Sequence, residues 1–377
     1  MSNLVQQEIL EIANSPEHSE TGGGHGQKGV DFQRYLAIYR LIELEESGAE
    51  NYLVLLEAIQ DVSEFDCCDS PSNAKIYQVK KKDRGEWSWN ELTNLTKQGT
   101  LSLEKFKDSP IGKLCTSANE FEQISCEAIF ISNTGCDIKL DGEGNVATSI
   151  RTSCEKIEKA LRLRLEKAIA HICQTEASST EKMLKNVSFD KAPIDVNNLE
   201  NSILAHVYRF IEKRSPAHSN QASSFTTAMY SKVAPLGAKT DKCHSFEELK
   251  KQHGITQKDF TSALASLQQL PDLMSLFELA LEELKASGIG FMTCTTLKLK
   301  AQSYYQRLVL NSVSQEEKEF LDICDDYLKF NRYSEPLIDF YNDMFSSVCG
   351  KSHLPDAEKK ALIILRVMNQ CYKDDLI

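Results

Sequence analysis

Two strand-like segments on either side of a single carboxylate constrain the fold of this chain more than any other feature. Residues 52–56 are apolar throughout, which is typical of a buried strand, and residues 76–80 alternate between two kinds of side chain, as a strand with two different faces does. Asp61 lies in the connection between them. If the two segments pair, one edge of the sheet carries the carboxylate of Asp61, the amide of Gln78 and the amine of Lys80.

The patterns on both sides of these segments predict an α/β domain. Residues 31–46 have the apolar period of a helix, residues 126–132 form another apolar run of strand length, and helical patterns lie between and after the strands. This order predicts a mixed sheet flanked by helices. We assign residues 29–215 to this domain and residues 1–28 to an N-terminal segment or linker.

The second half of the chain has a different pattern. Helical periodicity continues after residue 225 without a strand pattern, which predicts an all-α domain over residues 225–377. The expected helices are 245–252, 256–268, 273–287, 296–311, 315–330, 334–347 and 355–373. Residues 270–284 form a broad apolar face that suits a bundle core or, as the alternative, a subunit interface. Residues 246–264 have helix-turn-helix spacing, but few basic residues follow the turn, which argues against sequence-specific DNA reading.

Composition is that of an ordinary globular protein, with 41% hydrophobic and 26% charged residues. No apolar run approaches the roughly 20 residues that span a bilayer, and the polar N-terminus has no signal-peptide pattern. The twelve cysteines include no Cys-x-x-Cys pair, so we predict neither disulfides nor a structural zinc site. We therefore expect a cytoplasmic protein without a membrane partner.

A local basic patch follows the second strand. The net charge of −12 disfavours binding of a polyanion, so any phosphate-binding surface must be confined to a small region. Residues 75–84 contain five basic side chains and one acidic side chain, a net charge of +4. Lys81, Lys82 and Arg84 are the expected nucleic-acid contacts in this patch.

The trio of polar side chains matches the needs of phosphodiester hydrolysis. This reaction requires neutralisation of the phosphate charge and an activated water, both of which a divalent cation supplies. Mg²⁺, with Mn²⁺ as the alternative, prefers oxygen ligands such as those of Asp61 and Gln78. Lys80, on the same strand face as Gln78, is placed to orient the attacking water or to stabilise the developing negative charge. Glu57 is a further candidate, as a second ligand, as a base acting through water, or as a group that only polarises the site.

Each of these residues also has a purely structural interpretation. An aspartate after a strand is most often a turn residue, and Gln-x-Lys on a strand is usually a solvated face. The joint order of helix, strand, carboxylate turn and Gln-Val-Lys strand favours the chemical interpretation. The glycine-rich residues 21–28 have no Gly-Lys-Ser/Thr ending and no preceding strand, so we interpret them as a linker rather than a phosphate-binding loop.

The order of the motifs resembles the PD-(D/E)XK restriction-endonuclease-like superfamily, and in particular the double-stranded DNA endonuclease domain that bacterial antiphage systems use as an effector. That group has Gln-x-Lys in place of the usual Asp/Glu-x-Lys. The resemblance covers roughly residues 25–215, and it is carried by Gly29-Val-Asp-Phe-Gln33, Glu57-x3-Asp61-Val, Ile76-Tyr-Gln78-Val-Lys80, Trp87-Ser-Trp89 and Phe130-Ile-Ser-Asn133.

Residue by residue, this resemblance implies Asp61 and Gln78 as metal ligands and Lys80 as the catalytic lysine. Glu57 matches an acidic position of the group. Gln33 stands where related nucleases often have a glutamate, and is expected to support the site.

A nuclease followed by a helical half resembles more specifically the nuclease component of Lamassu-type defence complexes. Residues 225–377 lack the strands that the cyclic-oligonucleotide sensor of another branch requires. The Lamassu resemblance implies a bacterial antiphage and anti-plasmid endonuclease, bound to an SMC-like ATPase and an accessory subunit. It also implies activation by release and self-assembly, with a tetramer expected. The alternative is a non-catalytic helical scaffold subunit with a decayed nuclease fold, and a further alternative is an RNA-directed nuclease.

Overall fold

The computed structural model describes residues 2–15, 27–98, 103–175, 177–237, 242–269, 273–310, 312–331, 333 and 336–373. The chain forms two compact units. The first comprises Met1–His206 and Tyr230–Phe260, and the second comprises Val207–Met229 and Thr261–Ile377. These units are defined by packing alone, and the functional ranges 29–215 and 225–377 stay a prediction.

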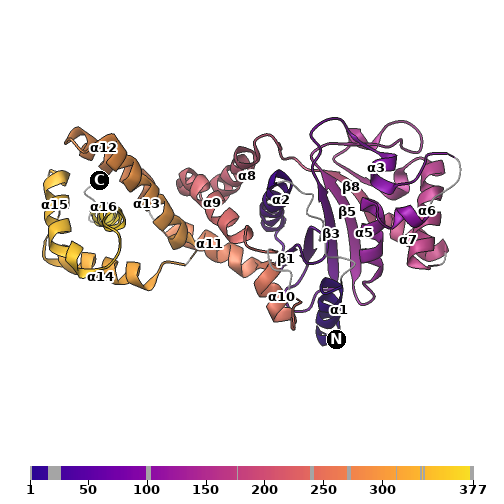
Figure 1. Cartoon of the computed structure of the whole chain (residues 1–377), viewed down its shortest axis with the longest axis horizontal. Helices are drawn as coiled ribbons and strands as arrows, with labels where there is room; N and C mark the ends of the chain where they lie inside the picture. The colour runs from indigo at the N-terminus through magenta and orange to yellow at the C-terminus, as the bar shows by residue number, and fades with distance from the viewer. Residues whose placement is uncertain are drawn as a thin grey trace. The chain divides into compact units, whose positions relative to one another are not determined.

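A seven-stranded mixed sheet forms the centre of the first unit (Figure 1). Its strand order is β7-β8-β5-β3-β2-β1-β9, in which β3, β5 and β8 run parallel and the remaining neighbours pair antiparallel. The strands of this sheet are β1 (Leu53–Leu56), β2 (Val62–Phe65), β3 (Asn73–Lys80), β5 (Ser125–Ser132), β7 (Arg151–Ser153), β8 (Val187–Lys191) and β9 (Gly254–Thr256). A separate pair joins β4 (Trp87–Ser88) to β6 (Cys136–Asp137).

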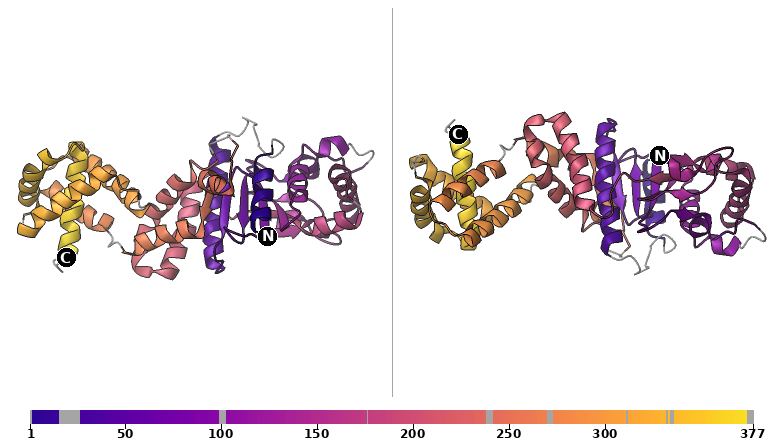
Figure 2. Two further views of the ribbon diagram at one scale, coloured as in Figure 1. Left: turned by 90° about the horizontal axis from the view of Figure 1, so that it is seen from below. Right: turned by 90° about the horizontal axis from the view of Figure 1, so that it is seen from above.

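Helices cover both faces of this sheet. The helices that lie wholly in the first unit are α1 (Ser2–Ala13), α2 (Gln27–Glu46), α3 (Trp89–Thr93), α4 (Leu103–Phe106), α5 (Pro110–Asn119), α6 (Lys159–Cys173), α7 (Ala177–Lys185) and α10 (Phe246–His253). Helices α1 and α2 lie on opposite sides of the strands (Figure 2). A mixed sheet flanked by helices confirms the predicted fold class.

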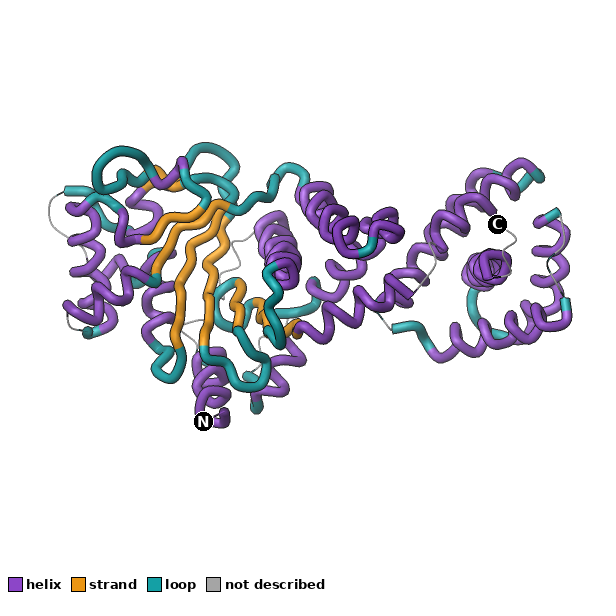
Figure 3. Tube along the Cα trace, turned by 180° about the vertical axis from the view of Figure 1, so that it is seen from behind, coloured by secondary structure: helices purple, strands orange, loops and turns teal. Residues whose placement is uncertain are grey.

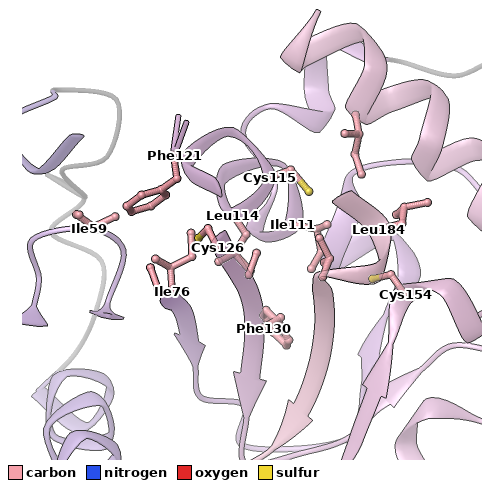
Figure 4. Close-up of a cluster of buried hydrophobic side chains, with 14 of the residues drawn as sticks. Ile59, Ile76, Ile111, Leu114, Cys115, Phe121, Cys126, Phe130, Cys154 and Leu184 are labelled. Atoms are coloured by element: carbon pink, nitrogen blue, oxygen red, sulfur yellow. The ribbon is translucent and has the colours of Figure 1, made fainter. Parts of the chain in front are cut away.

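The two faces of β3 pack against different helices. Because side chains alternate along a strand, Ile76, Gln78 and Lys80 share one face and Tyr77 lies on the other. Ile76 belongs to the apolar core beneath α5, part of which is shown in Figure 4. Tyr77 lies under the guanidinium of Arg40 on α2, at 5.5 Å from the ring centroid. The polar trio therefore extends the face that packs on α5, while α2 supports the opposite face.

The predicted direct pairing of segments 52–56 and 76–80 was wrong, because β2 lies between β1 and β3. Strand β2 lies within the connection between these two segments. Its sequence, Val-Ser-Glu-Phe, has no clean apolar alternation, yet all four residues are buried. Glu64 is tolerated there because it forms an ion pair with Arg40 on α2, with Oε1 at 2.5 Å from Nε.

The expectation of no strand after residue 225 was also wrong. Strand β9 pairs antiparallel with β1 and forms one edge of the sheet. It connects α10 directly to α11 (Gln257–Gln269), so the residues with helix-turn-helix spacing are a helix, a sheet strand and a helix. Three residues of ordinary composition (Gly-Ile-Thr) carry too little pattern for a strand to be predicted.

The described residues of the second unit contain helices and no strand, as predicted (Figure 3). Its helices are α12 (Leu273–Ala286), α13 (Phe291–Val309), α14 (Gln315–Phe330), α15 (Leu337–Val348) and α16 (Asp356–Lys373), and α8 (Leu199–Arg214), α9 (Ala222–Val233) and α11 contribute one part each. On α12, Phe277 and Leu284 are buried, whereas Leu279 is exposed. The apolar face is therefore mainly core, as the default interpretation has it.

Three further expectations concern the chain as a whole. All twelve cysteines are free thiols, as predicted. Among the described residues, no helix is long and apolar enough to cross a membrane. Most of the glycine-rich segment 21–28 lies outside the described residues, and its last two residues begin α2.

Candidate functional site

The β2–β3 ladder brings the predicted trio together. Val62 pairs with Tyr77, so Asp61, one residue earlier, lies beside Gln78. The Oδ2 atom of Asp61 accepts hydrogen bonds of 2.6 Å from Gln78 Nε2 and of 2.6 Å from the backbone N–H of Val79. The ammonium of Lys80 lies 3.7 Å from the same oxygen. A carboxylate, an amide and an amine thus meet at one point, as the sequence predicts.

Burial gives this cluster its electrostatic character. Asp61 is 1% exposed and Gln78 is fully buried at 0%, whereas the side chain of Lys80 keeps 15% of its surface. Charge interactions are stronger away from water, and the two donors and the nearby cation stabilise the buried carboxylate. Lys80 is the member of the trio that extends toward solvent.

The two ends of the Gln78 amide have different surroundings. A carboxylate oxygen requires a donor, so the amide nitrogen of Gln78 must face Asp61. Its oxygen, Oε1, is buried and has no hydrogen-bond partner among the residues that the structure describes. A buried polar atom left in this way costs about 1–3 kcal/mol. Such an oxygen is suited to a ligand that supplies positive charge.

The turn that carries Asp61 has an uncommon backbone. Both Glu57 and Gln60 have left-handed φ angles, of 53° and 58°. The N–H of Glu57 donates to the carbonyl of Asp61 at 3.0 Å and closes the turn. Gln60 is buried and donates through Nε2 to Ser117 Oγ on α5 at 2.6 Å. Non-glycine residues adopt this conformation only where their surroundings hold them, and such positions cluster at functional sites.

A partly buried ion pair joins α2 to the face of the sheet opposite the trio. Arg40 on α2 binds both carboxylate oxygens of Glu64, at 2.5 and 3.1 Å. Burial alone would lower the pKa of Arg40, but the charge of Glu64 and its hydrogen bonds outweigh this effect and raise it. Burial and the neighbouring Glu64 also raise the pKa of Tyr77 well above its usual value. Helix α2 is thereby joined to the two strands that position the trio.

A second polar cluster lies beside Lys80. Ser132, the partner of Lys80 on β5, accepts a hydrogen bond from Trp87 Nε1 at 2.8 Å. The ammonium of Lys82 lies 4.9 Å from the centroid of the Trp87 ring and donates to Glu91 at 2.7 Å. The hydrogen bond from Lys82, together with those from Ser88, lowers the pKa of Glu91 to about 2. The Lys82 ammonium therefore fixes the start of α3.

Lys81 and Arg84 are the other two expected nucleic-acid contacts. Lys81 forms an ion pair with Asp83, and this contact is the main cause of the lowered pKa of that carboxyl. Lys28 and Arg84 act on Asp83 in the same direction, so they lie in its vicinity. Arg84 is exposed. Nucleic-acid contact by Lys81, Lys82 and Arg84 stays a prediction.

Glu57 and Gln33 are the two remaining predicted residues. Glu57 is exposed at the opposite end of the Asp61 turn. Gln33 is buried in α2, the helix that supports the opposite face of β3. Sequence reasoning did not single out Gln60, Ser117 or Ser132, because single polar residues in a turn, a helix or a strand end form no pattern.

The donor set of the trio fits a cation that prefers oxygen. One carboxylate and one unpartnered amide oxygen are the ligand types that Mg²⁺ accepts, with water completing the shell. No group of three or more His, Cys, Asp or Glu side chains in the described part of the chain is arranged to hold a metal ion. Because the trio contains one carboxylate, the site is weakly charged. It does not match zinc sites, which are built from several Cys, His or carboxylate ligands.

Comparison with known proteins identifies one family. Residues 21–235 match the family model of the Cap4 dsDNA endonuclease domain, and this range contains the trio and all strands of the sheet except β9. No curated protein and no solved structure matches the chain. Since the match covers more than half of the 377 residues, the chain belongs to the Cap4 family of double-stranded DNA endonuclease domains.

Proposed function

We propose that this endonuclease hydrolyses double-stranded DNA at Asp61, Gln78 and Lys80, with a divalent cation as cofactor. The carrying observation is the buried cluster in which one Asp61 oxygen meets the Gln78 amide, the Val79 N–H and the Lys80 ammonium. The position of the cluster supports the proposal, because it lies at the end of β3 next to the basic residues that follow this strand. The order of carboxylate, amide and lysine also supports membership of the PD-(D/E)XK superfamily.

Each site residue has a separate role in the proposed reaction. Asp61 and the amide oxygen of Gln78 would hold Mg²⁺ or Mn²⁺, which when bound supplies Lewis acidity and lowers the pKa of water. Lys80, the least buried of the three, extends toward the substrate and stabilises negative charge as it develops on the phosphate. Glu57 is exposed at the far end of the turn and is proposed only to add negative potential.

The second unit is proposed to regulate this activity. It carries large apolar side chains that are exposed to solvent, namely Leu279, Phe291, Met292, Leu299 and Phe330. Exposed apolar surface is typical of protein-protein contact. This feature supports a bacterial antiphage effector of the Lamassu type, which an accessory subunit with an SMC-like ATPase holds inactive. Release and self-assembly into a tetramer would then activate it.

A cleavage assay tests the nuclease proposal. Purified full-length protein, separated by size into monomer and oligomer fractions, is incubated with supercoiled plasmid in Mg²⁺ or in EDTA. We expect nicked and linear products in Mg²⁺ only, and mainly from the oligomer fraction. A matched RNA duplex is expected to stay intact.

Other outcomes of this assay have direct meanings. A fully active monomer contradicts activation by self-assembly, and cleavage of RNA but not DNA favours the RNA-directed alternative. Absence of cleavage in every fraction, even at high concentration, contradicts the proposal and favours a non-catalytic scaffold.

A further inference from the structure

A segment outside the family-matched residues 21–235 is built into the hairpin that carries Asp61. Strand β9 pairs with β1 over Leu53 to Leu55, and the N–H of Gln257 donates to the carbonyl of Tyr52 at 3.0 Å. Strand β1 is therefore hydrogen-bonded along one edge to residues that follow the family-matched range in the chain.

His253 extends this ladder with its side chain. Leu55 pairs with Gly254, so His253 stands opposite Leu56, the last residue of β1. Its backbone belongs to α10, but its ring nitrogen Nδ1 lies 3.0 Å from the carbonyl oxygen of Leu56. Because that oxygen only accepts, Nδ1 must carry the proton. His253 is 5% exposed, so this bond is shielded from water.

Gly237 packs closely against Glu57, the residue that follows Leu56. It has a left-handed φ of +75°, and a Cβ added to it would lie 2.5 Å from Glu57 Cβ and 2.8 Å from Glu57 Cγ. Only a glycine therefore fits against Glu57, the residue that enters the turn with its own left-handed φ. The Leu56–Glu57 peptide is contacted by both His253 and Gly237.

The segment is itself firmly anchored in the first unit. Asn14, just after α1, exchanges two hydrogen bonds with the backbone of Cys243, at 2.8 and 2.9 Å. Cys243, Phe246 and Leu249 belong to the apolar core that also contains Leu53 and Leu55. His253 is therefore carried by an element of fixed position.

We propose that His253 and Gly237 are positioning residues of the nuclease site. They hold the Leu56–Glu57 peptide, which fixes the turn and places the Asp61 carboxylate against Gln78 and Lys80. Correct geometry of the site then depends on chain that lies beyond the family domain. The catalytic consequence rests on the function proposed for Asp61, whereas the effect on the turn does not.

Variants of the full-length chain test this role. His253→Phe keeps a ring but removes the donor, and His253→Asn returns a nitrogen at the place of Nδ1. Gly237→Ala adds a methyl group that clashes with the side chain of Glu57. The control is His244→Phe, which changes an exposed histidine of the same segment. We measure hydrogen exchange of the peptide that contains Glu57, kcat and KM for plasmid cleavage, and thermal unfolding.

We expect His253→Phe and Gly237→Ala to speed hydrogen exchange at Glu57 by about tenfold or more. Since small displacements of a catalytic group are costly, kcat should fall by about 10- to 100-fold with little change in KM. His253→Asn should restore most of both properties, and His244→Phe should match the wild type. The two proposals can fail separately. If His253→Phe exchanges faster at Glu57 while Lys80→Ala cleaves normally, the role of His253 in the turn stands and the proposed catalytic site is refuted. Unchanged exchange and cleavage in both His253→Phe and Gly237→Ala overturn the positioning role.

Discussion

Lys80→Ala is expected to slow cleavage of double-stranded DNA by about 10²- to 10³-fold, because it removes the cation that stabilises charge on the phosphate. The fold should be unaffected. Asp61 keeps hydrogen bonds from Gln78 and Val79 in the variant, and the lysine side chain is partly exposed. The measurement is the single-turnover rate on a linear duplex at saturating Mg²⁺, combined with a thermal unfolding curve.

The matched control for this variant is Lys167→Ala, which removes an exposed lysine from α6 in the same unit. Its rate and melting temperature should equal those of the wild type. A Lys80→Ala protein that cleaves within a factor of two of the wild type contradicts the assignment of the lysine. A variant that loses both cleavage and folding also contradicts the expectation, since Lys80 would then be structural.

Glu64→Gln is expected to lower the free energy of unfolding by about 1.5–3 kcal/mol, the typical contribution of hydrogen bonds to a charged group. The substitution removes the main counter-charge of Arg40, whose side chain is 18% exposed and keeps its ion pair with Glu43. It also weakens the link between α2 and the strands that carry the trio. Urea unfolding followed by circular dichroism gives the free energy of unfolding.

Glu181→Gln provides the comparison, because its ion pair with Lys185 is largely exposed. Exposed pairs contribute about 0–1 kcal/mol, so this variant should be nearly neutral. Equal stability of the two variants would show that the Arg40–Glu64 pair contributes little. Below its unfolding temperature, Glu64→Gln should still cleave DNA, since the pair lies on the face of β3 opposite the trio.

The strongly patterned elements were predictable from the sequence. Long amphipathic helices such as α14 and α16, and the apolar strand β5, have enough residues for their periodicity to be unambiguous. The position of Asp61 next to Gln78 and Lys80 was also predictable, although the reason differed. The two outer segments do not pair with each other, and the carboxylate reaches β3 because β2 follows it directly.

Elements whose stability comes from distant contacts were not predictable. Strand β2 contains Ser63 and Glu64, and its charged residue is buried only because Arg40, 24 positions earlier, compensates it. Strand β9 has three residues and is defined by its pairing with β1, far away in the chain. The contacts of Gln60 with Ser117 and of His253 with Leu56 have the same origin. Contacts between distant parts of the chain determine the structure at these positions, and the local sequence pattern does not indicate them.

Single-turnover cleavage by Asp61→Asn, together with calorimetric titration of Mg²⁺, tests the central claim most directly. The substitution keeps the size of the side chain and removes the one carboxylate of the trio. Cleavage should fall by about 10³-fold or more, as expected for loss of several kcal/mol of transition-state stabilisation, and the heat of Mg²⁺ binding should disappear. An Asp61→Asn protein that binds Mg²⁺ and cleaves duplex DNA at the wild-type rate would contradict the account.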